Sequence, residues 1–164
     1  MLGGARSGKS GRALSIAEAA RPEQIFIATA EAYDEEMAAR IARHILDRGT
    51  SWETLEAPLA LADVLMIACE TGKAVLVDCL TLWLSNIMHA GLNVVDESER
   101  LLQIIRSTTT PIVLVSNEVG MGIVPESSLG RHFRDEQGRL NQRVAEVCDR
   151  VEFVAAGLPL TLKP

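Results

Sequence analysis

The chain has 164 residues, of which 48% are hydrophobic and 23% are charged, and its formal net charge is −6. It is long enough to bury a core and too apolar to be disordered, so we expect one folded domain over residues 1–164. The acidic balance disfavours non-specific nucleic-acid binding, which needs a basic face, but it leaves a local phosphate pocket possible.

Short apolar runs rich in branched residues alternate with longer helical patterns. In chain order, we expect a helix at 9–20, a strand at 24–29, helices at 34–48 and 59–71, a strand at 74–79, helices at 81–90 and 96–107, a strand at 111–117, a helix at 138–149 and strands at 150–157 and 158–164. Gly49 and Gly72 stand where helix C-caps belong, and Pro22 follows the first helix. The inner strands are continuously apolar, as in parallel strands covered on both faces. The pattern predicts an α/β fold with a mostly parallel sheet flanked by helices and an antiparallel C-terminal strand pair.

The cysteines are odd in number and show no C-x-x-C spacing: they are Cys69, Cys79 and Cys148. A disulfide framework or a zinc cluster is therefore disfavoured, and a reducing compartment fits better. No apolar run reaches the roughly 18 residues that span a bilayer, and no charged-then-apolar leader is visible. We expect a cytoplasmic protein without membrane insertion.

The opening stretch fits the phosphate-loop pattern G-x-x-x-x-G-K-[ST]. Its residues are Gly3, Gly4, Ala5, Arg6, Ser7, Gly8, Lys9 and Ser10. Glycines let backbone N–H groups approach phosphate oxygens, Lys9 supplies a positive charge, and Ser10 offers a hydroxyl to magnesium. A helix that starts near Lys9 points its positive dipole end at the same anion. The alternative is a chance match in a flexible turn. Only Met1 and Leu2 precede the loop, so we expect its anchoring strand to be truncated.

A magnesium partner is expected at the end of another strand. Asp78 follows the apolar run "AVLV", which suits a carboxylate held beside a phosphate loop. The alternative is that Asp78 caps the helix that begins near Thr81. We prefer the magnesium or nucleotide role because the phosphate loop is complete.

The phosphate loop alone allows a GTP-dependent switch, a small-molecule kinase or a nucleotide-binding regulatory module. A switch normally carries an N-K-x-D motif after a late strand, whereas this chain reads "VSNEVGMGIVPE" there. It also lacks a D-x-x-G after the Asp78 strand. The switch is disfavoured, and the other two classes remain.

Several stretches together resemble one family. They are "GGARSGKS", "IATAEAYDEEMAARIARH", "VLVDCLTLWLSN", "VSNEVGMGIVPESSLGRHFRDEQGRLNQRVAE" and "VEFVAAGLPLTLK". In this order they resemble the bifunctional adenosylcobinamide kinase / adenosylcobinamide-phosphate guanylyltransferase of cobalamin biosynthesis. The resemblance implies a P-loop, RecA-like fold, a homotrimer, and ATP, GTP and Mg²⁺ as partners of the site.

The resemblance also implies two reactions on one chain. A nucleoside triphosphate first phosphorylates the aminopropanol hydroxyl of adenosylcobinamide. GTP then transfers GMP to an enzyme histidine, and adenosylcobinamide phosphate attacks this intermediate to give adenosylcobinamide-GDP. The family's histidine lies at the end of "DEEMAARIARH", which matches His44.

His44 has two structural alternatives, a solvent-facing or a partly packed histidine near a helix C-terminus. The chemistry supports a nucleophile, since imidazole has a pKa near 7 and leaves readily once it is reprotonated. On a helix His44 would share a face with Arg40, a cation able to contact phosphate.

By the same resemblance, further GTP contacts fall on strand ends and on the segment after His44: Ala28, Thr29, Ala30, Glu31, Ile45, Leu46, Asp47, Arg48, Glu56 and Asp78. Their structural alternatives are a strand-end turn for Thr29 and its neighbours, a helix cap for 45–48 and for Asp78, and a solvated strand carboxylate for Glu56.

A polar constellation in the most family-specific block could bind the corrinoid, the nucleotide or a neighbouring subunit: Glu118, Arg131, Arg134, Asp135, Asn141 and Gln142. His132 is as compatible with a structural role as with a functional one, and His89 suits a helix C-terminus. The apolar segment 80–88, with Trp83, is expected in the core or at a subunit contact.

Overall fold

The computed structural model describes residues 1–30 and 51–164. Within them a seven-stranded sheet has the order β3-β2-β4-β5-β1-β6-β7. The strands are β1 Leu2–Gly3, β2 Gln24–Ala28, β3 Trp52–Glu56, β4 Ala74–Asp78, β5 Ile112–Asn117, β6 Val151–Ala155 and β7 Leu158–Lys163. All neighbours pair in parallel except β6 and β7, which are antiparallel. The α/β fold and the closing antiparallel pair are confirmed.

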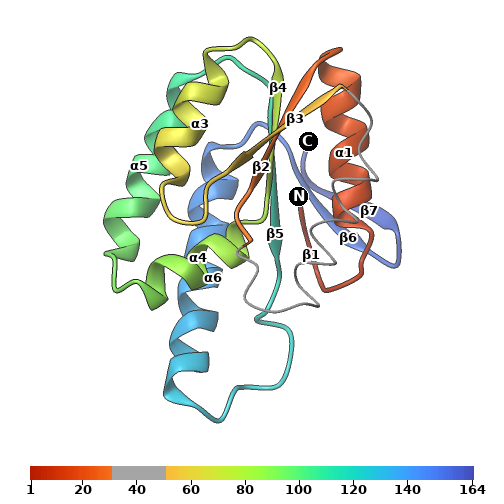
Figure 1. Ribbon diagram of the computed structural model, residues 1–164. Coiled ribbons are helices and arrows are strands. Elements are labelled where there is room, and N and C mark those ends of the chain that lie inside the picture. Colours follow the sequence, from red (N-terminus) through yellow and green to blue (C-terminus); the bar gives the residue numbers. More distant parts are fainter. Residues whose placement is uncertain (31–50) are drawn as a thin grey trace.

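The helices are α1 Lys9–Ala20, α3 Leu61–Cys69, α4 Leu80–His89, α5 Val94–Ser107 and α6 Ser128–Val147. Figure 1 shows α1 on one face of the sheet and α3 to α6 on the other. No helix in the described ranges is both long enough and apolar enough to cross a bilayer.

Strand side chains alternate between the two faces, and each face has its own core. On the α1 face, Phe26, Leu76 and Val115 pack with Ala13 and Ala17. On the other face the strand residues pack against α3 to α6, in a cluster that contains Ile25, Ile27, Val75, Val77, Leu114, Trp83 and Leu84. The inner strands are therefore apolar on both sides, which explains their continuous apolar runs. Trp83 is fully buried, so the core position expected for segment 80–88 is confirmed for this residue.

Two element predictions differ from the structure. The strand β3 was not expected at 52–56, because as an exposed edge strand it needs no continuous apolar run. The helix expected at 138–149 begins ten residues earlier, at Ser128, where the Ser127 hydroxyl accepts the Gly130 N–H. Gly130 and Gly138 masked this first half, since glycine is a poor helix former.

The first strand is short, as expected, yet it is paired on both sides. Leu2 lies opposite Ser116 of β5 and Phe153 of β6. Two further backbone bonds extend the pairing: Ser116 N–H donates to Met1 O, and Glu118 N–H donates to Gly3 O. Even two strand residues thus place the following loop at the carboxyl edge in the middle of the sheet.

Candidate nucleotide-binding site

The phosphate loop leaves β1 and ends in the first turn of α1. Gly8 is the N-cap of α1 with φ of 96°, a left-handed conformation that favours glycine. The loop packs against the β6–β7 turn, where the Gly157 N–H donates to Ser7 O at 2.8 Å. A Cβ on Gly8 would lie 3.2 Å from Gly157 Cα, and a Cβ on Gly3 would lie 2.5 Å from the Val154 carbonyl oxygen. Close backbone approach therefore requires both glycines.

Positive charge converges on this loop. Lys9 is only 9% exposed, and its Nζ donates to Gly4 O at 3.0 Å, so the ammonium is held over the loop itself. Ala5 and Arg6 are exposed, with Arg6 at φ of 54°, and the buried Ser7 hydroxyl has no hydrogen-bond partner. The N–H groups at the start of α1 and the helix dipole suit an anion at the same place.

The strand register brings other predicted residues to the same edge of the sheet. Ala28 of β2 lies opposite Glu56 on one side and opposite Asp78 on the other. Asp78 in turn lies opposite Val115 of β5, and Gly3 lies opposite Asn117 of the same strand. With adjacent strands about 4.8 Å apart, the Asp78 strand and the loop strand are roughly 10 Å apart. Alternation from Leu76 puts the Asp78 side chain on the α1 face, which is the face of the loop's helix.

Thr29 and Cys79 connect β2 to the Asp78 strand. The fully buried Thr29 hydroxyl donates to Cys79 O and accepts the Cys79 N–H, both at 2.8 Å. The peptide bond between Asp78 and Cys79 is cis. Burial raises the pKa of the Cys79 thiol, the charge of Asp78 raises that pKa further, and Lys9 lowers it. The charges of Asp78 and Lys9 thus both act at this thiol.

The Thr29 hydroxyl is therefore engaged within the protein, as its strand-end alternative implies. Ala30 is half-buried. Glu56 is exposed at the end of β3, a position that fits both a GTP contact and a solvated strand carboxylate.

Ser10 and Asp78 have the right chemistry for magnesium. No cluster of three metal-binding acids, histidines or cysteines occurs in residues 1–30 and 51–164. Mg²⁺ at nucleotide sites needs no such cluster, since one or two protein oxygens and the substrate phosphates suffice. A hydroxyl in the first turn of α1 and a carboxylate on the α1 face fit this donor set. The N-cap of α4 is Cys79, not Asp78, which argues against the capping alternative.

The polar constellation divides into separate structural roles. Arg131 donates to the carbonyls of Pro125 and Glu126 and so holds the loop before α6. Glu118 accepts the N–H of Gly120 within its own turn. Glu118, Asn141 and Gln142 line a shallow hollow of about 360 Å³ beside β1 and β6. Arg134 and Asp135 form an ion pair at 3.8 Å, and the exposed His132 lies in the first turns of α6.

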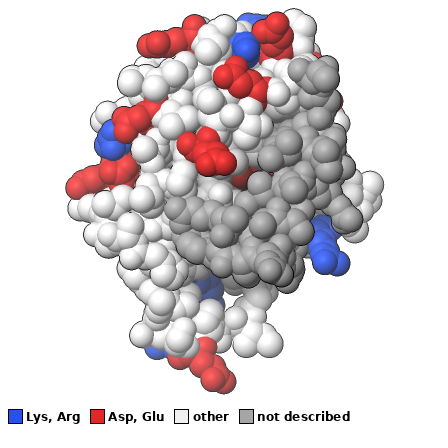
Figure 2. Space-filling view, in the orientation of Figure 1, with Lys and Arg blue, Asp and Glu red and all other residues white. Residues whose placement is uncertain are grey.

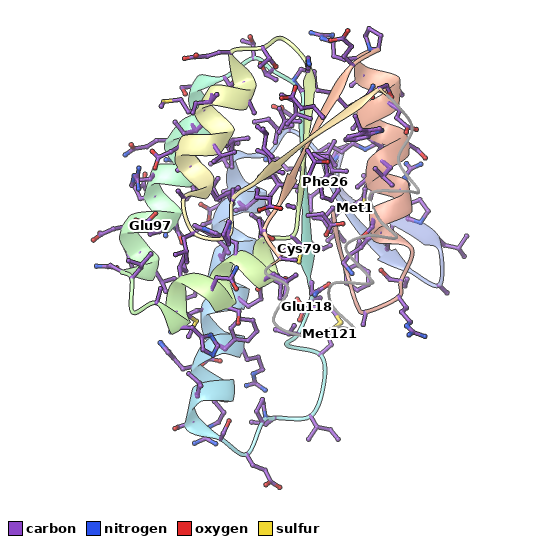
Figure 3. The ribbon with its side chains drawn as sticks, in the orientation of Figure 1. Met1, Phe26, Cys79, Glu97, Glu118 and Met121 are labelled. Atoms are coloured by element: carbon purple, nitrogen blue, oxygen red, sulfur yellow. The ribbon has the colours of Figure 1, made fainter. Side chains whose placement is uncertain are left out.

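His89 occupies the last turn of α4, with Nδ1 2.7 Å from Ser85 O, as expected for a helix-end histidine. Figure 3 labels Cys79, Glu118 and Met121 at the loop end of the sheet. The predicted nucleophile His44 and its neighbours Glu31, Ile45, Leu46, Asp47 and Arg48 lie outside the described residues, as do the expected helix 34–48 and Gly49.

Sequence reasoning missed two residues at this edge, Thr81 and Asn117. The Thr81 hydroxyl accepts the Asn117 N–H at 2.8 Å. The sequence does contain a pattern that points to Asn117: the apolar run "IVLV" is followed by polar residues at the strand end, just as "AVLV" is followed by Asp78.

The distribution of charged side chains on the surface favours a small, local site for an anion over an extended basic surface. Acidic side chains dominate the coloured part of the face in Figure 2, and the few basic ones there are scattered. The coloured part of this face therefore offers no extended basic surface for an anion.

Comparison with known proteins gives the same assignment. The model of the family "Cobinamide kinase / cobinamide phosphate guanyltransferase" matches residues 1–162. The bifunctional adenosylcobalamin biosynthesis protein CobP of Pseudomonas aeruginosa is 48% identical, over 99% of this chain and 95% of its own length. The CobU proteins of Salmonella typhimurium and Escherichia coli, with the same descriptive name, are 39% and 35% identical over 99% of this chain and 98% of their lengths. The chain belongs to the cobinamide kinase / cobinamide phosphate guanyltransferase family.

Proposed function

We propose that this chain catalyses two successive reactions of cobalamin biosynthesis. It phosphorylates adenosylcobinamide with ATP or GTP, and it then transfers GMP from GTP to adenosylcobinamide phosphate. The observation that carries the proposal is a complete phosphate loop, with Lys9 and the start of α1 directed at one anion site, in a member of this family. A single-activity kinase is the alternative, and it differs in having no covalent intermediate.

In the first reaction the aminopropanol hydroxyl oxygen bonds to the γ-phosphorus, and the bond from this phosphorus to the β–γ bridging oxygen breaks. The nucleoside diphosphate leaves, and the hydroxyl proton passes to an oxygen of the transferred phosphoryl group. The protein acts mainly by position and charge. Lys9 exchanges its bond to Gly4 O for the outer phosphates, and the N–H groups of the loop bind the oxygens between them.

In the second reaction a His44 nitrogen bonds to the α-phosphorus of GTP, and pyrophosphate leaves. The phosphate oxygen of adenosylcobinamide phosphate then bonds to this phosphorus, and the phosphorus–nitrogen bond breaks. Neutral imidazole suits both steps, since it is nucleophilic near pH 7 and leaves once protonated. The assignment of His44 rests on the family resemblance.

Magnesium, where bound, would neutralise phosphate charge, and the hydroxyl of Ser10 and the carboxylate of Asp78 would hold it. We further propose GTP contacts at the strand ends that carry Ala28, Thr29, Ala30 and Glu56, at Glu31, and at residues 45–48. The alignment of Ala28, Glu56 and Asp78 at one edge supports this placement.

The guanylyl step is tested with GTP labelled at its α-phosphate. The protein should acquire label that survives base and is released by acid, as a phosphoramidate does. His44→Ala should remove the label, and the exposed His132→Ala should keep it. Absence of label on the wild type overturns the second reaction, and label on His44→Ala overturns the residue assignment.

The kinase step is tested by cobinamide-dependent phosphoryl transfer from ATP and GTP. Lys9→Ala should lower kcat by about 100-fold or more, in line with the loss of a charge aimed at the transferred group. Lys73→Ala is the matched control, since Lys73 pairs with Glu23 and Glu53 at the opposite end of the sheet. Equal activity of the two variants contradicts the role of Lys9.

We also propose a cytoplasmic homotrimer. The described cysteines Cys69, Cys79 and Cys148 are all free thiols, which supports a reducing compartment. Leu158, Leu160 and Leu162 are exposed on the edge strand β7, which supports association of copies. A solution mass near three times the 17.8 kDa chain mass is the expected result, and a monomer contradicts it.

A further inference from the structure

Asn117 ends β5, the strand that lies between the phosphate-loop strand and the Asp78 strand. It stands directly opposite Gly3, the first glycine of the loop. Its side-chain Oδ1 is buried and has no hydrogen-bond partner. A buried acceptor without a partner is costly, so such an atom calls for an explanation.

The direction of this side chain follows from its neighbours on β5. Leu114 packs in the cluster against α3 to α6, and the Ser116 hydroxyl bonds to Asn141 of α6. Val115 packs on the other face, with Ala13 and Ala17 of α1. Because strand side chains alternate, Asn117 follows Val115 to the α1 face. That face carries Asp78 and the first turn of α1, with Lys9 and Ser10.

The backbone of Asn117 is held firmly on both sides. Its N–H donates to Thr81 Oγ1 at 2.8 Å, and its carbonyl accepts Asn141 Nδ2 at 3.1 Å. Asn141 is itself fixed, since its Oδ1 accepts the Ser116 hydroxyl at 2.6 Å and Gln137 Nε2 at 2.9 Å. Gln137 is fully buried, and its Nε2 also donates to Ser116 Oγ at 2.9 Å. The network fixes the position of Asn117 and leaves its Oδ1 without a donor.

The missing partner must be a hydrogen-bond donor. Phosphate oxygens at neutral pH are acceptors and cannot donate to a carbonyl oxygen, so the nucleotide's phosphates do not pair with Asn117 Oδ1. The phosphoryl acceptor of the proposed kinase reaction carries an O–H group, and its oxygen must approach the γ-phosphorus beside the loop. An alcohol is therefore the donor that this position suits.

We propose that Asn117 Oδ1 accepts a hydrogen bond from the hydroxyl of the phosphoryl-acceptor alcohol and so aligns its oxygen with the γ-phosphorus. The amide does not take the proton, because an amide carbonyl is far too weak a base. Asn117 thus acts on the acceptor in the kinase reaction, and it has no part in forming the GMP–enzyme intermediate. This inference rests on the proposed kinase function.

The test compares Asn117→Ala with wild type in three assays. Cobinamide phosphorylation should fall about 10- to 100-fold in kcat/KM, the range expected for one lost hydrogen bond at a buried site. Protein labelling by α-labelled GTP and the Kd of a non-hydrolysable GTP analogue should each stay within about twofold. Asn117→Asp, which keeps an acceptor oxygen, should recover part of the lost kinase activity.

Stability separates this role from a structural one. Asn117→Ala removes an unsatisfied acceptor, so its melting temperature should not fall, whereas Asn141→Ala breaks the network and should lower it. Asn93→Ala is the matched control: the Asn93 side chain caps α5, so this variant loses stability but keeps wild-type kinase kinetics.

Three results overturn the inference. Wild-type kcat/KM in Asn117→Ala shows that the amide does not contact the acceptor. An equal loss of GTP labelling and phosphorylation shows that it serves the nucleotide or a metal-bound water instead. A wild-type protein that phosphorylates no cobinamide overturns the proposed kinase function, and the inference falls with it.

Discussion

Replacing Gly8 by alanine tests the geometry of the phosphate loop. Gly8 has φ of 96°, and a left-handed backbone costs an L-residue roughly 1–2 kcal/mol. The added Cβ also lies 3.2 Å from Gly157 Cα, so the loop or the β6–β7 turn must shift by a few tenths of an ångström. The backbone term alone should lower the melting temperature by about 2–8 °C, at about 2–4 °C per kcal/mol for a chain of this size. Because the loop N–H groups move with it, nucleotide affinity should fall at least about tenfold.

Gly11 provides a matched control three residues further along. It lies inside α1, and an added Cβ there has no heavy atom within 4 Å. Gly11→Ala should therefore stabilise the protein by about 0.5–1 kcal/mol, since alanine favours the helix and restricts the unfolded chain. The two variants are compared by thermal unfolding and by titration with a fluorescent GTP analogue. If Gly8→Ala is as stable as Gly11→Ala and binds nucleotide as wild type does, the reasoning on the loop is wrong.

Three further predictions concern the surroundings of the site. Glu152 is buried, and hydrogen bonds from Arg12 hold the pKa of its carboxyl below its ordinary value of 4.5. Because this pKa is lowered in the folded state, the ionised carboxylate stabilises the protein above about pH 4.5, and the stabilisation is lost as the pH falls through the folded pKa. The free energies of unfolding in urea of wild type and Glu152→Gln should therefore differ at pH 7 and converge in acid. Trp83→Phe removes the bond from Nε1 to Leu59 O at 2.9 Å and opens a void, and it should cost about 2 kcal/mol by denaturant titration. Thr29→Val leaves the Cys79 N–H without its acceptor, while Cys79 O keeps the Trp83 N–H at 3.2 Å, and it should cost roughly 1–3 kcal/mol. An unchanged midpoint would contradict the bridging role of that hydroxyl.

The elements that sequence predicted best are those whose local pattern has one physical explanation. The inner strands β2, β4 and β5 are buried on both faces, so their apolar runs are unbroken and their ends lie within a residue or so of the prediction. The loop from Gly3 to Ser10 was visible because a phosphate site limits both glycine positions and the lysine. In contrast, β3 depends on a neighbouring strand for its hydrogen bonds, and its residues show no such run.

Long-range contacts explain what the sequence left open in the polar constellation. Asn141 could be read as a ligand contact, and the structure places it in a buried network with Ser116 and Gln137. Gln137 could not be identified from the sequence, since it is one polar residue among many in a polar helix. Its role becomes visible only where α6 packs against β5 and Gln137 bonds to Ser116. Arg131 likewise has its partners in the loop that precedes its own helix.

The order of two adjacent polar residues at the end of β5 shows how the fold divides structural from functional roles. Ser116 and Asn117 are neighbours, so alternation sends one to α6 and the other to the α1 face. Ser116 meets a network that uses its hydroxyl both as donor and as acceptor. Asn117 meets the loop, with its backbone held on both sides and its carbonyl oxygen unsatisfied. A shift of one residue in the register of β5 would exchange these positions and move the amide away from the phosphates. The pairing of Leu2 with Ser116 and of Gly3 with Asn117 is thus what places both the loop and this amide at one site, even though β1 has only two residues.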